Sequence, residues 1–307
     1  MNFKTNGYEA WPALPYLEFK ATGNLLHMVC QMIGKLKLTA PFEPEWANVT
    51  LLLNSQGLTT GVIPCGLKAL TVRMNLFTHE IQLASSDGQT EVIKLRSMSV
   101  AELFFQMLDA LKKLNLDLTI NPKPQELMDP ILFNEDKETK EYKPELANAW
   151  FRILLSSSVV LNRYHARFLG KTQPLGFMWG TFDLRDVRYN GKLLPMQTTG
   201  IMSGYIRRNA MDEELIETGW WSGNEQYPRP AYYSFTFPQP PKIEDSKILP
   251  VKAHWDANMG EFMLDYDDVR LEKDPALELL AFFDTTYQAG AKLSGWSEGL
   301  LGSGMPK

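Results

Sequence analysis

Two sets of polar side chains, one in each half of the sequence, are spaced so that they could converge on a ligand. The first set is His27, Gln31 and Lys35, and the second is Arg163, Arg167 and Lys171. Side chains four residues apart share one face of a helix, so each set predicts a polar, mostly cationic stripe. A guanidinium offers a planar fork of donors that suits a carboxylate or a phosphate. We expect Lys35, Arg163 and Lys171 to bind an anion where the stripes meet; the alternative is a solvated helix face paired with acidic side chains.

A second group of candidates lies on a predicted strand that follows the second stripe. Alternation places Trp179, Asp183 and Arg185 on one face of that strand. Trp179 and Trp220 would pack on the apolar part of a ligand, although large aromatic side chains also commonly fill a core. Asp183 and Arg185 form either a functional dyad or a surface ion pair worth about 0–1 kcal/mol. In an enzyme, we expect His27 or Asp183 to move the proton.

The standard catalytic and cofactor-binding motifs are absent from the sequence. Gly34-Lys35 and Gly170-Lys171 end helical runs and lack the GxxxxGK[ST] spacing of a phosphate loop. Neither GxSxG nor HExxH occurs, and the four histidines are far apart. The two cysteines have no CxxC spacing, which argues against a zinc site and fits a reducing compartment. We therefore expect neither a metal nor a cofactor.

The composition narrows the class of protein. The chain has 307 residues, of which 44% are hydrophobic and 22% are charged, as in ordinary soluble globular proteins. Its net charge of −5 argues against a general nucleic-acid binder or a protein of anionic membrane surfaces. The N-terminus lacks the apolar region of a signal peptide, and no long uninterrupted apolar run is present. We expect a cytoplasmic protein that binds a small molecule, with no nucleic-acid or membrane partner.

The first half of the chain predicts a helix, several antiparallel strands and a second helix. Apolar spacing of three and four residues predicts a helix over about 18–35. Alternation predicts a strand at 70–76, and the Asp-Gly at 87–88 predicts a hairpin turn. Ser99 followed three residues later by glutamate is a capping box that opens the second helix. A short strand is expected at 116–120.

The second half predicts the same order of elements. A helix begins at Pro144 and runs to Gly170, and a final helix begins after Asp274. Between them lie an irregular stretch at 189–212 and the most aromatic part of the chain, at 219–237. Alternation around Tyr233 predicts a strand there, and Trp220 and Trp221 are expected in a turn bounded by glycines. The short connections are those of antiparallel strands, which favours an α+β fold.

A nearly constant offset relates the two halves. Lys35 and Lys171 are 136 residues apart, and Trp46 and Trp179 are 133 residues apart. We predict an internal duplication, in which helix–antiparallel sheet–helix units pack as a pseudo-symmetric pair. The predicted parts are a first repeat at 1–122, a linker at 123–143, a second repeat at 144–294 with an insertion at 189–212, and a flexible tail at 295–307.

Several short motifs together resemble a bacterial protein family known only as a domain of unknown function. They are Trp11-Pro12, His27, Ile33-Gly34-Lys35, Gly57-Leu58-Thr59-Thr60, Ile63-Pro64, Phe168-Leu169-Gly170-Lys171, Trp179-Gly180-Thr181-Phe182-Asp183-Leu184, Gly260-Glu261-Phe262 and Tyr266-Asp267-Asp268-Val269-Arg270. The resemblance covers about residues 9–298, which is most of the chain, and it implies no catalytic residues.

Two functions from different classes are consistent with the sequence. The first is binding of a small anionic or aromatic molecule between the two repeats, with or without metal-independent catalysis. The second is a protein–protein interaction or structural module, in which exposed aromatic side chains of 219–237 and the insertion at 189–212 dock a partner protein or a second copy of the chain.

Overall fold

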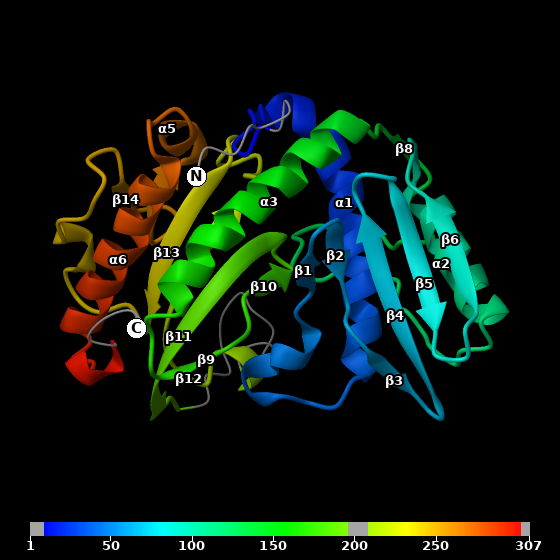
Figure 1. Ribbon diagram of the computed structural model, residues 1–307, viewed down its shortest axis with the longest axis horizontal. Coiled ribbons are helices and arrows are strands. Elements are labelled where there is room, and N and C mark those ends of the chain that lie inside the picture. The colour runs from blue at the N-terminus through cyan, green and yellow to red at the C-terminus, as the bar shows by residue number, and fades with distance from the viewer. Residues whose placement is uncertain (1–8, 196–207, 302–307) are drawn as a thin grey trace, which may run out of the picture.

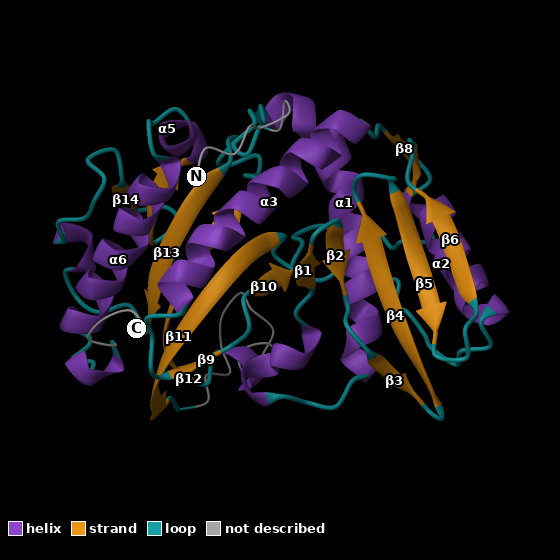
Figure 2. Ribbon diagram, viewed as in Figure 1, coloured by secondary structure: helices purple, strands orange, loops and turns teal. Residues whose placement is uncertain are grey.

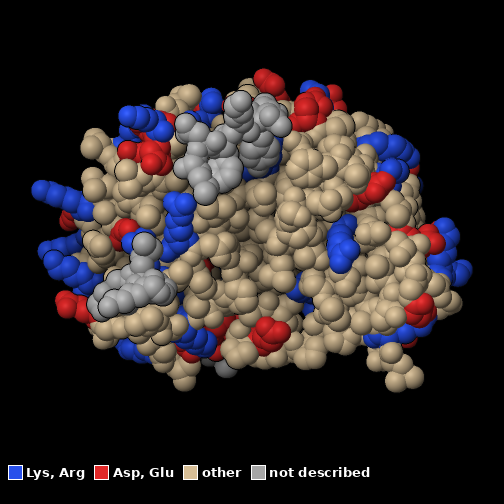
Figure 3. Space-filling view, viewed as in Figure 1, with Lys and Arg blue, Asp and Glu red and all other residues tan. Residues whose placement is uncertain are grey.

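The computed structural model describes residues 9–195 and 208–301. Within these residues the chain forms two antiparallel sheets, each covered by helices, in the α+β arrangement that the connections predicted (Figure 1). The described helices include none that is long and apolar enough to span a membrane. On the face shown in Figure 3, charged side chains of both signs lie mainly around the edge, and the centre over α3 (Pro144–His165) is largely uncharged.

The first half builds a six-stranded sheet against helices α1 (Tyr16–Leu36) and α2 (Val100–Lys113). Ser99 accepts a hydrogen bond from the backbone N–H of Glu102 at 3.1 Å, as the capping box predicted. The strands are β1 (Leu52–Asn54), β2 (Gly57–Thr59), β3 (Ile63–Cys65), β4 (Lys68–Asn75), β5 (Glu80–Ser85) and β6 (Thr90–Lys94), in the order β1-β2-β4-β5-β6 with β3 beside β4. The short elements η1 (Lys37–Thr39), η2 (Pro44–Val49), β7 (Met98–Ser99) and β8 (Thr139–Lys140) connect this sheet to the rest of the fold.

The second half builds a seven-stranded sheet whose one face is covered by α3 and α6 (Pro275–Leu293), as Figure 2 shows. The strands are β9 (Lys171–Thr172), β10 (Gly176–Met178), β11 (Asp183–Leu193), β12 (Glu213–Trp221), β13 (Ala231–Phe237), β14 (His254–Asp256) and β15 (Glu261–Asp265). Their order is β10-β11-β12-β13-β15-β14, with β9 beside β11. The short helices η3 (Ile243–Asp245), α5 (Tyr266–Arg270) and η4 (Glu298–Leu300) complete the described chain.

The two sheets are joined where β1 meets β10. Leu51 and Phe177 exchange two backbone hydrogen bonds of 3.0 and 2.7 Å. Beside them Phe182 stacks on Trp150 of α3, with ring centroids 5.2 Å apart, and on His27 of α1 at 4.8 Å. One continuous apolar core therefore runs through both halves.

Alternation along the seven-stranded sheet separates a helix-covered face from an open one. Trp220 and Tyr232 are fully buried and belong to the same apolar core as Phe283 of α6. Side chains of the opposite parity, among them Asp183 and Arg185, point to the other face. That face, with α1 beside it, forms the candidate site.

Some predicted elements differ from those observed. No strand occurs at 116–120, and the long helix of the second half ends at His165, five residues before Gly170. Residues 189–193 continue β11, and Trp220 and Trp221 lie within β12, not in an irregular turn. Residues 196–207 of the predicted insertion and 302–307 of the predicted tail lie outside the described residues.

The internal duplication stays a prediction. Both halves have the order helix, antiparallel sheet, helix. The positions matched by the offset differ in local structure, because Lys35 lies in the last turn of α1 whereas Lys171 lies in β9. Trp46 lies in the 3₁₀ segment η2 with a φ of 59°, and Trp179 follows the strand β10.

Candidate functional site

A cavity of about 950 Å³ lies between α1 and the open face of the seven-stranded sheet. Most of its walls are apolar or aromatic, from Phe19 of α1 to Trp221 of β12 and Phe235 of β13. The polar and charged side chains that line it are Lys20, Asn24, His27, Glu126, Thr181, Asp183, Arg185, Glu217, Ser222, Asn224, Glu225 and Glu261, together with the hydroxyls of Tyr16 and Tyr233. A cavity of this size accommodates a small organic molecule.

Strand register brings the polar groups of the cavity together. Arg185 of β11 is opposite Gly219 of β12, which is opposite Tyr233 of β13. Asp183 lies two residues before Arg185 on β11, and Glu217 lies two residues before Gly219 on β12. Because alternate residues of a strand face the same side, all four side chains emerge into the cavity.

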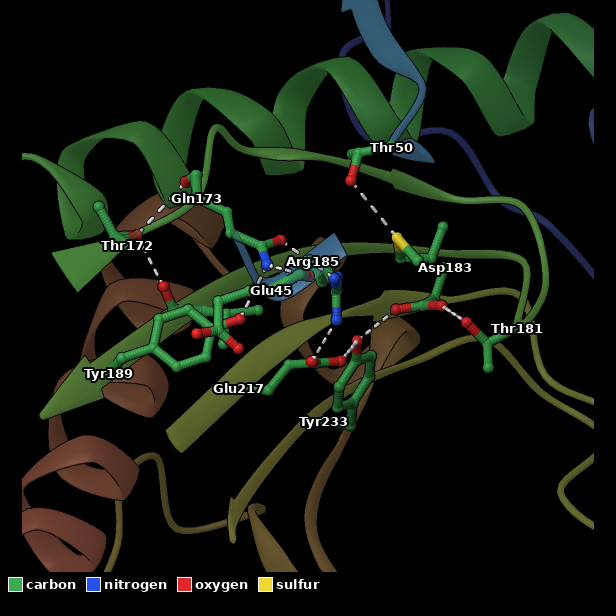
Figure 4. Close-up of polar contacts among 12 residues, drawn as sticks. Glu45, Thr50, Thr172, Gln173, Thr181, Asp183, Arg185, Tyr189, Glu217 and Tyr233 are labelled. Atoms are coloured by element: carbon green, nitrogen blue, oxygen red, sulfur yellow. Dashed lines mark hydrogen bonds and ion pairs between the residues drawn. The ribbon is translucent and has the colours of Figure 1, made fainter. Parts of the chain in front are cut away.

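These groups form one buried network of hydrogen bonds (Figure 4). The Tyr233 hydroxyl contacts carboxyl oxygens of both Asp183 and Glu217, at 3.1 Å for Glu217 Oε1. Arg185 donates from Nη1 to Glu217 Oε2 at 2.8 Å and from Nη2 to Gln173 Oε1 at 3.1 Å. The ion pair is buried, since Arg185 and Glu217 are each 9% exposed. The alternative predicted from the sequence was a surface ion pair between Asp183 and Arg185, whereas the ion pair observed for Arg185 is buried and joins it to Glu217.

Gly219 makes room for this network. A Cβ at this position would lie 2.7 Å from the Tyr233 Oη and 2.1 Å from the backbone oxygen of Leu184. The absence of a side chain here lets the Tyr233 phenol cross the face of β12 and reach both carboxyl groups.

Two further carboxyl groups, those of Glu126 and Glu261, face the cavity from outside the network. Burial, together with the neighbouring Asp183 carboxylate, raises the pKa of Glu126 to about 7. Burial also raises the pKa of Glu261 to about 8, with contributions from Glu217 and Asp183. Glu126 keeps accessible surface, which faces the cavity it lines. Near neutral pH both groups are therefore poised between the protonated and ionised forms.

The network carboxyls are shifted in the same direction. Burial raises the pKa of Asp183 despite its hydrogen bonds to Thr181 and Tyr233, and raises that of Glu217 despite the charge of Arg185. Among the described residues, no group of three or more His, Cys, Asp or Glu side chains is placed to hold a metal ion. The network thus lines the cavity mainly with carboxyl groups, and Arg185 is a buried cation among them.

The polar face of α1 positions two segments that border the cavity. The Nε2–H of His27 lies 2.9 Å from the backbone oxygen of Gly180 and 3.1 Å from that of Trp179. Gln31 donates to the backbone oxygen of Gln125 at 2.8 Å and accepts from its N–H at 3.1 Å, which holds the segment that carries Glu126. Burial lowers the pKa of His27 to about 4, so its imidazole is neutral at physiological pH.

The cationic residues predicted to bind an anion are not among the residues that line the cavity. Lys35 is 4% exposed, and its Nζ lies 6.0 Å from the ring centroids of Phe133 and Trp179. Arg163 is exposed on α3. Lys171 forms ion pairs with Glu45 and, at 2.6 Å, with Glu213. The three cations therefore have separate surroundings.

The two tryptophans predicted to pack on a ligand are core residues instead. Trp179 is buried against Gly34, where a Cβ would lie 2.1 Å from its Cγ, and donates to the backbone oxygen of Val49 at 3.0 Å. Trp220 is fully buried on the helix-covered face. Its neighbour Trp221 lines the cavity, because adjacent strand residues face opposite sides.

Of the site residues predicted from the sequence, Asp183, Arg185 and His27 line this cavity, whereas Glu126, Glu217 and Tyr233 were not predicted. Strand alternation was a usable signal for Tyr233, which was predicted on a strand. Glu217 required the strand β12, which was not predicted. Glu126 has a φ of 59° in a segment without periodicity, so no local signal marked it.

Comparison with known proteins gives a family relationship and no activity. A search of the curated proteins and a search of the solved structures returned no match to the chain. A family model described as a family of unknown function, DUF5996, matches residues 11–303, in agreement with the resemblance seen in the motifs. Because the match covers most of its length, the chain belongs to the DUF5996 family.

Proposed function

We propose that the protein binds a small organic cation with an apolar or aromatic body in the cavity between α1 and the seven-stranded sheet. The observation that carries the proposal is the charge balance inside a cavity with aromatic walls. Lys20 pairs with Glu225 at 2.6 Å, and both side chains are substantially exposed. Of the described residues, the remaining charged side chains that line the cavity are the carboxyl groups of Glu126, Asp183, Glu217 and Glu261 and the guanidinium of Arg185.

A cation satisfies this arrangement better than an anion. An ammonium group would form charge-assisted hydrogen bonds with Glu126 and Glu261, which have no partner among the described residues. Faces of the surrounding aromatic rings also attract a cation. An anion would meet an excess of carboxyl groups in a site of low dielectric, where like charges repel strongly.

The proposal keeps one part of the sequence-based hypothesis and changes another. An aromatic ligand between the two halves fits the cavity walls. The anionic ligand rested on Lys35, Arg163 and Lys171, which lie elsewhere. Duplication of the halves is not required, because residues from unrelated elements supply the groups that line the cavity.

We propose binding and assign no reaction. The two groups predicted to move a proton already have partners within the protein. His27 is hydrogen-bonded to the backbone oxygens of Trp179 and Gly180. Asp183 accepts from Thr181 and Tyr233. Both residues are better suited to shaping the cavity than to exchanging protons with a ligand.

The aromatic side chains of 219–237 give little support to the alternative of an interaction module. Trp220, Tyr232 and Tyr233 are at most 6% exposed, and Trp221 and Phe235 line the cavity. The aromatic side chains of 219–237 thus do not form an exposed docking surface.

The experiment is mass analysis of the small molecules that co-purify with the protein and are released on denaturation. Asn24 is an exposed residue of α1 that lines the cavity, so Asn24→Trp should fill part of it without disturbing the core. Leu17 is 83% exposed on the same helix and does not line the cavity, so Leu17→Trp is the matched control. We expect a cationic molecule to be released from the wild type and from Leu17→Trp, and to be depleted in Asn24→Trp. Release of only anionic molecules, or equal release from both variants, would refute the proposal.

A further inference from the structure

Arg188 of β11 is a buried cation on the helix-covered face of the sheet, away from the cavity described above. It is 1% exposed and lies between aromatic rings, with Cζ 3.4 Å from the ring centroid of Tyr164 and 4.4 Å from that of Tyr287. One arm of the guanidinium donates to the backbone oxygen of Tyr164 at 2.5 Å. This leaves most of its five N–H donors to be accounted for.

The guanidinium of Arg188 lacks a carboxylate partner. Its Nε is buried without a hydrogen-bond partner, and among the described residues it forms no ion pair. The nearby acidic groups contact other cations: Asp186 Oδ1 lies 2.5 Å from Nδ1 of His165, with its Oδ2 buried and without a hydrogen-bond partner, and Asp284 Oδ1 lies 2.9 Å from Nη2 of Arg167. Buried charges in proteins are normally paired, so this one points to a missing partner.

A second, small cavity lies where that partner would bind. Its volume is about 120 Å³, and it is lined by Arg167, Arg188, Asp284, Tyr287, Gln288 and Leu301. At roughly 30 Å³ per water molecule, it holds about four waters. It therefore has room for a small oxyanion but not for a nucleotide.

We infer that this cavity is a binding site for a small oxyanion of the size of inorganic phosphate or a short carboxylate. Among the residues that the structure describes, two guanidiniums and one carboxylate line it, which leaves one net positive charge. The planar forks of Arg167 and Arg188 supply donors whose geometry matches an oxyanion. The Asp284 carboxylate opposes the anion and competes with it for Arg167.

Cation–π contacts are the competing explanation for a buried arginine without a carboxylate. The rings of Tyr164, Tyr287 and Phe168 all lie within 5.1 Å of its Cζ, and each contact is worth about 0.5–2 kcal/mol. Such a cage explains why the charge is tolerated. It does not supply a hydrogen-bond acceptor for the buried Nε of Arg188.

The test is titration with inorganic phosphate against chloride at matched ionic strength, followed by thermal unfolding and by calorimetry. Ligands that bind only the native state stabilise it by RT ln(1 + [L]/Kd), so the unfolding temperature rises with ligand concentration. We expect phosphate to raise the melting temperature of the wild type, with one site per chain. Arg167→Gln removes a charge-assisted contact, so its Kd should be about tenfold weaker or more. Asp284→Asn removes the competing carboxylate and should tighten Kd about tenfold.

Lys292→Gln is the control for loss of one positive charge, because Lys292 is exposed on the same helix as Asp284 and does not line the cavity. It should bind phosphate as the wild type does. The inference is overturned if neither phosphate nor acetate stabilises the wild type or Asp284→Asn more than chloride does. It is also overturned if the phosphate effect survives Arg167→Gln unchanged. Neither outcome depends on substituting Arg188, which would risk unfolding the core.

Discussion

Replacement of Arg185 by methionine tests whether the carboxyl groups of the cavity depend on one buried cation. The substitution removes the 2.8 Å ion pair with Glu217 and the hydrogen bond to Gln173 while roughly preserving side-chain volume. Removing one partner of a buried ion pair typically costs about 3–5 kcal/mol of unfolding free energy. We expect a loss in this range for Arg185→Met at about pH 8.

The cost should depend on pH in a defined direction. Burial raises the folded-state pKa of Glu217 above 4.5 and Arg185 lowers it, so losing Arg185 raises that pKa further. A carboxyl whose folded pKa is raised costs stability progressively as pH rises from its unfolded pKa to its folded pKa. The loss caused by Arg185→Met should therefore be smaller at about pH 6 than at about pH 8, by at most roughly 2.7 kcal/mol for one proton.

The assay is urea-induced unfolding of four proteins at both pH values. They are the wild type, Arg185→Met, Glu217→Gln and the double variant. Since the two residues contact each other, the double variant should lose less stability than the sum of the single variants. The reasoning is refuted if the loss in Arg185→Met is independent of pH, or if the two substitutions are additive within about 0.5 kcal/mol.

Two other substitutions probe particular contacts. Gly219→Ala places a Cβ 2.7 Å from the Tyr233 Oη and 2.1 Å from the Leu184 backbone oxygen. We therefore expect denaturant unfolding to show a loss of about 1–3 kcal/mol or more in the free energy of unfolding. Unchanged stability would show that β12 has room for a side chain there. Lys35→Met should stabilise the protein at neutral pH, since burial lowers the pKa of Lys35 to about 8 and the charge has no ion-pair partner among the described residues. A lysine whose folded-state pKa is lowered costs stability below that pKa, and the cost disappears as the pH rises toward the pKa of the unfolded state. The gain in Lys35→Met should therefore shrink in thermal scans at about pH 10. A gain that grows with pH would contradict this.

Local patterns in the sequence predicted many of the elements. The capping box at Ser99 begins α2, and the alternation around Tyr233 is observed in β13. Strand parity also placed Asp183 and Arg185 on a common face, which is the face that lines the cavity. These features depend on residues close in sequence, so a single chain reveals them.

The wider organisation of the site depends on long-range contacts that periodicity does not encode. Lys35 and Lys171 end similar sequence patterns, but Lys171 meets Glu45, which is 126 residues away. Glu126 reaches the cavity because Gln31 holds the preceding residue, 94 positions from it in sequence. Residues 123–143, predicted as a linker, therefore contribute a carboxyl group to the candidate site.

The most direct test of the central proposal is calorimetric comparison of two probes that share an aromatic body and differ in charge. 2-Phenylethylamine carries an ammonium group, and 3-phenylpropionate carries a carboxylate. The account predicts that the amine binds more tightly, that its affinity rises from about pH 6 to about pH 8, and that protons are released on binding. This follows because a bound cation favours the ionised forms of Glu126 and Glu261, whose pKa values are about 7 and 8. Tighter binding of the carboxylate, or amine binding that is independent of pH, would contradict it.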